Sequence, residues 1–244
     1  MTAILNDTTL CAIVRDEMMN PAGGIVRFCD SVLPHVEQAV IVDTGSTDGT
    51  LEELEKIRSK FPHLTVKSRH FDGYASSRNF SLNHAKTKFI LVLDADEVIR
   101  QRDYANIAEF TRTIDADWND FVGLNFKFIR VGLPGEEFPQ LGHNPRLFRN
   151  KPQFRYDRVQ WEQLYNAQGH TVARYCDNID IRIYNFMASV EADNIKKREW
   201  YDAIKAATNT PTDTDARIKQ LSPAQAPYFF MWKAYNPQRE RYES

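Results

Sequence analysis

Phe89-Ile90-Leu91-Val92-Leu93-Asp94-Ala95-Asp96-Glu97 is the stretch of this chain that decides its fold class. Its apolar run, partly β-branched, predicts a short strand buried on both faces, as in a parallel sheet covered by helices. Two carboxylates spaced i, i+2 follow where the chain leaves that strand, and ligands bind at the carboxyl ends of strands in open α/β sheets. Because such carboxylates repel one another, they favour a hard divalent cation that bridges them to the phosphates of a substrate. The alternative is an acidic turn that merely ends the strand.

Alternating strand and helix patterns fill the first half of the chain. Strands are expected at residues 9–14, 38–43, 64–67 and 89–93. Helices are expected at residues 24–33, 50–61 and 74–85. Thr50 and Glu53 fit a capping box at the start of the second helix. This β-α-β-α-β-α-β order predicts an α/β fold in which helices flank a mostly parallel central sheet.

The pattern changes after Asp96. Period-two alternation over residues 121–129 predicts a half-exposed antiparallel strand, and hence a small antiparallel addition to the sheet. The other elements expected are a helix at 103–114, a loop at 131–142, short strands at 146–148 and 179–184, and a helix at 190–207. We expect a single domain over residues 1–244, with a nucleotide-binding half at 1–100, an acceptor and catalytic half at 101–210, and a C-terminal tail at 211–244.

The composition is that of an ordinary globular protein. The chain has 244 residues, of which 42% are hydrophobic and 26% charged, and its net charge of −2 gives no support to a nucleic-acid partner. Cys11, Cys29 and Cys176 lack metal-ligand spacing and fit a reducing cytoplasm. No apolar run is long enough for a transmembrane segment, and residues 1–6 do not resemble a signal peptide. We therefore expect a cytoplasmic protein. The aromatic segment at 227–235 is the one candidate for peripheral contact with the inner face of a membrane, and docking of this segment onto the domain is the favoured alternative.

Two further segments carry polar groups that suit a nucleotide. Asp43 ends the second strand, and the loop at 44–50 offers small residues, backbone N–H groups and a helix N-terminus. Asp43 and Asp48 can equally serve only to cap their turns. Arg78 lies near the start of a predicted helix, where it opposes the helix dipole, so a nearby anion would explain it.

Taken together, three ordered blocks resemble the family 2 glycosyltransferases with the GT-A fold. They read Val42-Asp43-Thr44-Gly45-Ser46-Thr47-Asp48-Gly49-Thr50, Tyr74-Ala75-Ser76-Ser77-Arg78-Asn79-Phe80-Ser81-Leu82 and Ile90-Leu91-Val92-Leu93-Asp94-Ala95-Asp96-Glu97. Within that family the chain is most similar to the branch of lipopolysaccharide-core-type and repeat-fused glycosyltransferases. The resemblance is strong over residues 10–99 and weaker at 144–149 and 159–164.

The resemblance implies a nucleotide-sugar donor, most often a uridine diphosphate (UDP) sugar. Backbone at the end of the first strand would border the base, Asp43 would accept hydrogen bonds from the nucleoside, and Arg78 would lie near the diphosphate. The donor-binding residues that it implies are Ile13, Val14, Arg15, Asp43, Gly45, Asp48, Arg78, Asp94 and Ala95.

The resemblance also implies a divalent cation, Mn²⁺ or Mg²⁺, with Asp96 as a direct ligand and Asp94 in its coordination shell. Asp96 counts as catalytic because the cation would stabilise charge that develops on the leaving diphosphate. Relatives tend to add a late His as a further ligand, but the matching stretch at residues 181–186 contains none. His170 and Asn185 are the remaining candidates for that ligand.

An inverting transfer needs a carboxylate on the side of the sugar opposite the leaving group, to take the proton of the acceptor hydroxyl. Relatives often carry His-Glu near this point. Here Trp161 replaces the His and Glu162 keeps the acid, so Glu162 is the predicted base, with Glu97 as the second candidate. Glu97, His143, Arg146 and Trp161 are assigned to the acceptor side, where Arg146 would support its loop or contact the donor phosphates. The acceptor implied is a surface glycan or a lipid-linked saccharide.

Two other functions remain open at this point. A sugar nucleotidyltransferase would carry a Gly-rich basic loop after the first strand, which residues 15–20 do not provide. A catalytically impaired nucleotide-sugar-binding protein would explain the missing His, but Arg78, Asp94 and Asp96 argue against it. A dinucleotide-binding enzyme is disfavoured because no G-x-G-x-x-G follows the first strand.

Overall fold

The computed structural model describes residues 4–18, 24–117, 123–131, 140–141, 144–157, 162–172 and 181–186. The predicted helix at 190–207, the C-terminal tail and Cys176 lie outside these residues. Two predicted acceptor-side residues, His143 and Trp161, also lie outside them.

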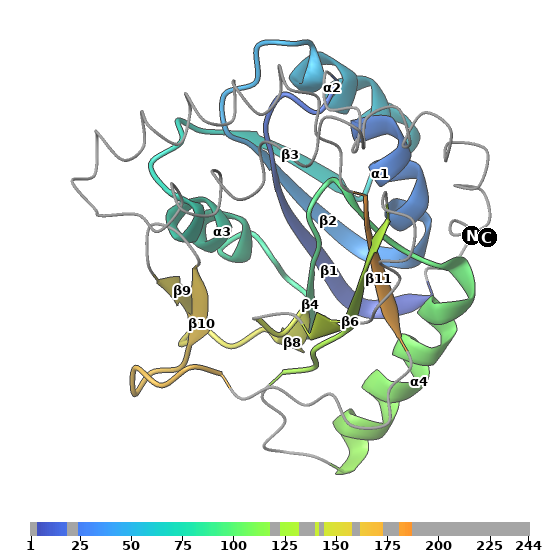
Figure 1. The fold of residues 1–244 in the computed structure, drawn as a ribbon, viewed down its shortest axis with the longest axis vertical. Helices are drawn as coiled ribbons and strands as arrows, with labels where there is room; N and C mark the ends of the chain where they lie inside the picture. The colour runs from blue at the N-terminus through green and yellow to red at the C-terminus, as the bar shows by residue number, and fades with distance from the viewer. Residues whose placement is uncertain are drawn as a thin grey trace.

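The central sheet contains the strands predicted in the first half of the chain (Figure 1). Its strands are β1 (Leu5–Val14), β2 (Val36–Asp43), β3 (Leu64–Ser68), β4 (Phe89–Val92) and β8 (Leu147–Arg149). Their order is β3-β2-β1-β4-β8, and every pair is parallel except β4 with β8. The prediction of a mostly parallel sheet is confirmed, and the carboxyl ends of β1, β2 and β4 lie along one edge.

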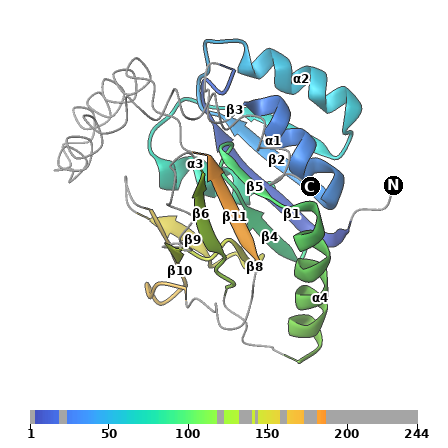
Figure 2. The ribbon, with the colours of Figure 1, turned by 45° about the vertical axis from the view of Figure 1, so that its right-hand side comes forward.

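Helices cover both faces of this sheet, as Figures 1 and 2 show. The helices are α1 (Ile25–Val32), the short 3-10 helix η1 (Leu33–His35), α2 (Thr50–Lys60) and α3 (Tyr74–Leu82). Side chains of β4 divide between the two faces, because successive residues of a strand point in opposite directions. Phe89 and Leu91 pack in the cluster that contains α1 and α2, whereas Ile90 and Val92 pack in the cluster that contains α3. The short apolar run at 89–93 is therefore a strand buried on both faces.

The predicted capping box at Thr50 does not form. Thr50 is the first residue of α2 rather than its N-cap, which is Gly49 with φ 96°. Asp48 Oδ1 accepts hydrogen bonds from the Thr50 backbone N at 3.0 Å and from Thr50 Oγ1 at 2.6 Å. The Thr50 hydroxyl also accepts a hydrogen bond from the backbone N of Met18, so its side chain connects the loop after β1 to the start of α2.

A second sheet packs beside the first and comes mostly from the second half of the chain (Figure 2). Its order is β5 (Glu97–Ile99), β11 (Arg182–Phe186), β6 (Lys127–Val131) and β7 (Gln140–Leu141). A hairpin of β9 (Arg155–Asp157) and β10 (Gln163–Tyr165) stands apart from it. One cluster of buried side chains includes residues of both sheets, among them Leu91 and Ile183.

The strand expected at 121–129 differs from its prediction. β6 begins at Lys127 and pairs in parallel with β11, whereas the β6–β7 and β5–β11 pairs are antiparallel, so the predicted small antiparallel addition is confirmed. Asn125, which the alternation places on the exposed face, is buried together with Leu124 and Phe126, so this stretch is not half-exposed. The alternation of the sequence cannot reveal this, because β11 comes from a segment more than fifty residues further along the chain.

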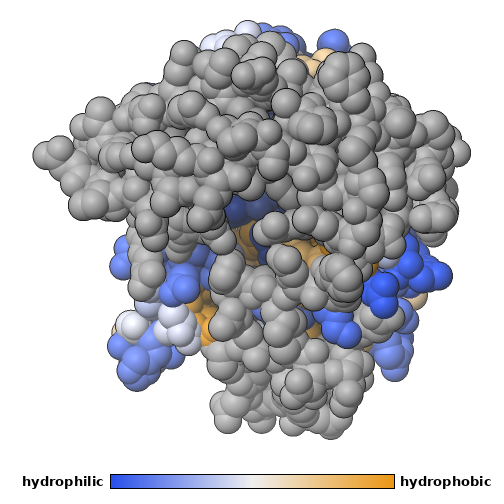
Figure 3. Space-filling model, viewed as in Figure 1, coloured by the Kyte–Doolittle hydropathy of each residue, from blue (hydrophilic) through white to orange (hydrophobic). Residues whose placement is uncertain are grey.

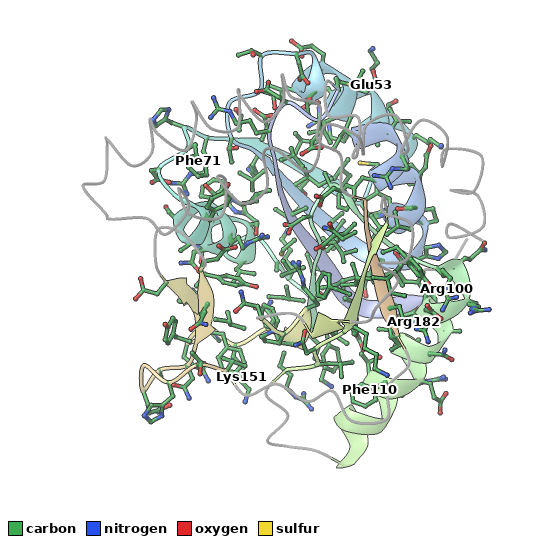
Figure 4. The ribbon with its side chains drawn as sticks, in the orientation of Figure 1. Glu53, Phe71, Arg100, Phe110, Lys151 and Arg182 are labelled. Atoms are coloured by element: carbon green, nitrogen blue, oxygen red, sulfur yellow. The ribbon has the colours of Figure 1, made fainter. Side chains whose placement is uncertain are left out.

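The helix α4 (Gln101–Asp117) packs against β1 of the central sheet, and its Tyr104 hydroxyl donates to the carbonyl oxygen of Ser31 in α1 at 3.3 Å. Just before it, Arg100 lies with its guanidinium 5.2 Å from the centre of the Tyr184 ring, and its Nε donates to Asp103 Oδ2 at 3.2 Å. Figure 4 shows Arg100 and Arg182 on the same side of the molecule. Among the described residues visible in the space-filling view, hydrophilic ones lie mainly toward the left and right edges and hydrophobic ones mainly between them (Figure 3). In the part of the chain that the structure describes, no helix has the length and apolar character needed to span a membrane.

Gly123 offers a test of the packing that supports β8. A methyl group at this position would stand 2.5 Å from Cβ and 2.9 Å from Cγ of Pro145, a rigid ring directly before Arg146. We expect Gly123→Ala to lower the free energy of unfolding by about 1–3 kcal/mol through overpacking. Chemical denaturation would measure the change, with Gln153→Ala on an exposed turn as the control. An unchanged free energy of unfolding would mean that Pro145 moves aside without cost.

Candidate active site

The turn that follows β4 contains three of the predicted site residues. The backbone N of Glu97 donates to the carbonyl oxygen of Asp94 at 2.9 Å, and Glu97 Oε2 accepts a bond from the backbone N of Asp94 at 2.9 Å. Glu97 is only 1% exposed. The side chain predicted to face the acceptor therefore folds back into the protein and closes the Asp94–Glu97 turn. This burial argues against Glu97 as a base that must reach a substrate hydroxyl.

Arg78 of α3 connects this turn to the predicted base. Its Nη2 donates to Asp94 Oδ1 at 2.7 Å, and its Nε donates to Glu162 Oε1 at 2.5 Å. The residue is 7% exposed. The anion expected near Arg78 is thus supplied, at least in part, by two carboxylates of the protein itself.

Arg146 makes a second bridge from the opposite side of Asp94. Its Nη2 donates to Glu97 Oε1 at 2.5 Å and to Asp94 Oδ2 at 3.4 Å, and its guanidinium lies 5.0 Å from the centre of the Phe128 ring. We call the resulting series Glu162–Arg78–Asp94–Arg146–Glu97 the acid–arginine network. It joins α3, the end of β4, the residue before β8 and the residue before β10.

The charges of the network set the pKa values of its acids. Burial alone would raise the pKa of Asp94, but Arg78 and Arg146 outweigh it and lower that pKa to about 2. Burial raises the pKa of Glu97 to about 8; Arg146 opposes this shift, while Asp94 and Asp96 add to it. Removal from water thus dominates the shift at Glu97, whereas the two guanidiniums dominate the shift at Asp94.

Two asparagines, which sequence reasoning did not assign to the site, position the backbone around Glu162. Asn144 donates from Nδ2 to the carbonyl oxygen of Glu162 at 2.6 Å and accepts at Oδ1 from the backbone N of Leu164 at 3.2 Å. Asn79 forms the same kind of pair with the backbone N and carbonyl oxygen of Tyr156, both at 2.8 Å. Both residues lie within motifs that carry the family resemblance, but nothing local in those motifs identifies their partners.

The predicted nucleoside side is formed by two loops at the carboxyl ends of β1 and β2. Asp43 is 1% exposed, and its Oδ2 accepts bonds from the backbone N of Gly45 at 3.0 Å and of Ser46 at 3.1 Å. Asp16 joins the two loops, because its backbone N donates to Ser46 Oγ at 2.9 Å and its Oδ1 accepts from Thr47 N at 2.7 Å. Asp43 thus organises its own loop, and its contact with a nucleoside stays a prediction.

The other predicted donor residues lie around the same loops. Val14, the last residue of β1, accepts two bonds from Thr44 at its carbonyl oxygen, and Ile13 precedes it. Arg15 Nη1 donates to the carbonyl oxygen of Thr44 at 3.3 Å. Asp48 accepts a hydrogen bond from the backbone N of Thr50 at the start of α2, as expected if Asp48 caps this turn. On the other side of the site, Arg27 of α1, which sequence reasoning missed, contacts the Ala95 carbonyl oxygen at 3.5 Å through Nη2.

The residues predicted to hold a metal are only partly brought together. Asn185 pairs in register with Glu97 across β11 and β5, one residue beyond Asp96. His170 lies in the exposed turn after β10, and Figure 2 shows β10 and β5 in different parts of the fold. Among the described residues, no three His, Cys, Asp or Glu side chains lie close enough to hold a metal ion by themselves. The oxygen donors near the turn nevertheless suit Mg²⁺ or Mn²⁺, which take one or two carboxylates and fill the remaining positions with substrate oxygens and water.

Comparison with known proteins now decides the family. Residues 19–178 match the sequence pattern of glycosyl transferase family 2, which spans both halves of the described fold. The chain belongs to glycosyl transferase family 2. A TPR repeat-containing protein of Synechococcus elongatus is 30% identical over 156 residues, which cover 64% of this chain and 35% of that protein. The poly(ribitol-phosphate) β-N-acetylglucosaminyltransferase TarS of Staphylococcus aureus is 32% identical over 117 residues, which cover 47% of this chain and 20% of TarS.

Solved structures confirm the fold of this family 2 protein. The structure of Staphylococcus aureus TarS residues 1–349 in complex with UDP-GlcNAc has a TM-score of 0.53 at 17% identity, over 75% of this chain and 59% of that one. The complex of the same fragment with UDP has a TM-score of 0.52 at 16% identity. Likeness at this identity shows the fold alone, and it confirms the predicted GT-A type. The chain spans at most 35% of the two curated relatives named above.

Proposed function

We propose that this family 2 protein transfers a sugar from a nucleotide-diphosphate donor to an acceptor hydroxyl, with inversion at the anomeric carbon. The observation that carries the proposal is the acid–arginine network, in which Arg78 holds the Asp94 carboxylate of the turn after β4 and the Glu162 carboxylate at once. Arg78 thereby fixes the position of the proposed base, Glu162, relative to Asp94 in the proposed donor site. Family membership supports the same reaction class.

On the donor side, Asp96 would hold a divalent cation together with Asp94, and Asn185 is the candidate for a further oxygen ligand. When bound, the cation would act as a Lewis acid toward the diphosphate leaving group. The two loops joined by Asp16 would bind the nucleoside. UDP is the proposed donor nucleotide, because a TarS fragment of the same fold has been solved with UDP and with UDP-GlcNAc.

On the acceptor side, Glu162 is the proposed general base. Arg78 Nε binds its Oε1, which leaves Oε2 as the oxygen that would take the proton from the acceptor hydroxyl. The side chain is 12% exposed, so it remains accessible from one side. Arg78 would keep the carboxylate oriented before the acceptor arrives.

The proposed acceptor is a saccharide hydroxyl, on a surface glycan or a lipid-linked saccharide. The similarity to a TPR repeat-containing protein supports the repeat-fused branch of the family. The proposed setting is the cytoplasm, with the inner face of a membrane when the acceptor is lipid-linked.

A donor screen tests this function. We expect a UDP-sugar to raise the melting temperature of the protein only when Mn²⁺ or Mg²⁺ is present, because the ligand stabilises the folded state by mass action. Guanosine and thymidine diphosphate sugars are the comparison set, and release of nucleoside diphosphate is measured in parallel with a saccharide panel as acceptors. Binding without any turnover would favour a nucleotide-sugar-binding protein. No donor effect with either metal would contradict the proposal.

A further inference from the structure

The Asp94–Glu97 turn depends on both carboxylate oxygens of Glu97. Oε2 accepts the bond from the backbone N of Asp94, and Oε1 accepts the bond from Arg146 Nη2. Because the side chain is buried, it cannot exchange these partners for water without opening the protein. The geometry of the turn that carries Asp96 therefore depends on where Arg146 lies.

Arg146 is itself held firmly beside β4. Its carbonyl oxygen accepts a bond from the backbone N of Val92 at 2.8 Å, and its own N donates to the carbonyl oxygen of Leu124 at 2.9 Å. Its side chain is 14% exposed and packs against the Phe128 ring. The guanidinium thus projects from a backbone fixed to the last residue of β4, directly next to the turn.

Arg146 and Arg78 have different partners and so should have different effects. Arg78 contacts Asp94 and Glu162, and it would affect donor and base together. Arg146 forms its ion pairs with Asp94 and Glu97, both within the turn. A change at Arg146 should therefore alter the donor side while the acceptor side keeps its partners.

We infer that Arg146 is a positioning residue for the donor, which acts through Glu97 to hold the Asp94–Asp96 carboxylates in the shape that binds the cation and diphosphate. This inference rests on the proposed function and revises the acceptor-side role expected for both residues. Arg146 Nη2 donates to both carboxylates while the planar guanidinium lies against the Phe128 ring, so a Lys would keep the charge but not the ring contact.

The test measures Mn²⁺-dependent binding of UDP by calorimetry in Arg146→Gln, Arg146→Lys and the exposed control Arg112→Gln. Arg146→Gln is expected to weaken binding by about 10–100-fold, the usual effect of removing a residue that orients metal ligands. Arg146→Lys should restore part of the affinity, and Arg112→Gln should bind as the wild type does. Donor KM should rise in Arg146→Gln while acceptor KM stays unchanged, a split that general loss of structure would not produce.

Melting temperatures show whether each variant is folded at the temperature of the measurement. If Arg146→Gln is not folded, Glu97→Gln takes its place, because the amide keeps the bond to Asp94 but loses the charged pair with Arg146. Unchanged UDP affinity in a folded variant would overturn the inference but not the proposed function. A rise in acceptor KM without a rise in donor KM would have the same consequence. If the wild-type protein binds no nucleotide with Mn²⁺, the proposed function fails together with the inference.

Discussion

Glu162→Gln is expected to reduce sugar transfer by about 10²–10⁴-fold, the usual contribution of a general base, while donor binding is retained. The Gln side chain keeps an oxygen that can accept the bond from Arg78 Nε, but it cannot take a proton from the acceptor hydroxyl. The loss should therefore fall on kcat rather than on donor affinity. Steady-state kinetics with calorimetric donor binding would measure both quantities.

Two further variants separate chemistry from structure at this position. Glu162→Ala also removes a carboxylate partner of the buried Arg78, so we expect it to lower the melting temperature and to weaken donor binding. Glu109→Gln, an exposed acid on α4, should leave turnover unchanged. If Glu162→Gln transfers sugar at nearly the wild-type rate, another group is the base and Glu162 serves only to hold Arg78.

Asp96→Asn is expected to abolish metal-dependent binding of UDP while the protein remains folded. Asn preserves the size of the side chain and one oxygen, but it removes the charge that would attract a divalent cation. Calorimetric titration of UDP with and without Mn²⁺ measures the effect, and Asp7→Asn, exposed on β1, is the control. Wild-type affinity in Asp96→Asn would remove Asp96 from the proposed metal site.

The two acids of the motif should respond differently to the same change. Asp94 lies between the guanidiniums of Arg78 and Arg146, and each of its oxygens binds one of them. Asp94→Asn removes the charge that both arginines share, so we expect it to lower the melting temperature more than Asp96→Asn does. Equal melting temperatures in the two variants would contradict this structural role of Asp94.

Local patterns in the sequence were enough to predict the framework of the fold. The apolar run at 89–93 with acids directly behind it is a buried strand that ends at a turn, as predicted. The repeated alternation of strand and helix correctly predicted a mostly parallel sheet, because each connecting helix must cross back over the sheet. The prediction of a capping box failed at Thr50, because its hydroxyl can bind either the N-terminus of the helix or a nearby side chain. In the structure it binds Asp48 instead of capping α2.

The sequence by itself therefore determined the order of strands and helices in the first half of the chain, the resemblance to the family, and the acids after β4. Only the tertiary structure decided which charges meet, since Arg78 joins Asp94, 16 residues away, to Glu162, 84 residues away. It also paired β6 with β11 in parallel and turned Glu97 inward onto Arg146. These features depend on contacts between segments that are distant in the chain, and local periodicity carries no information about them.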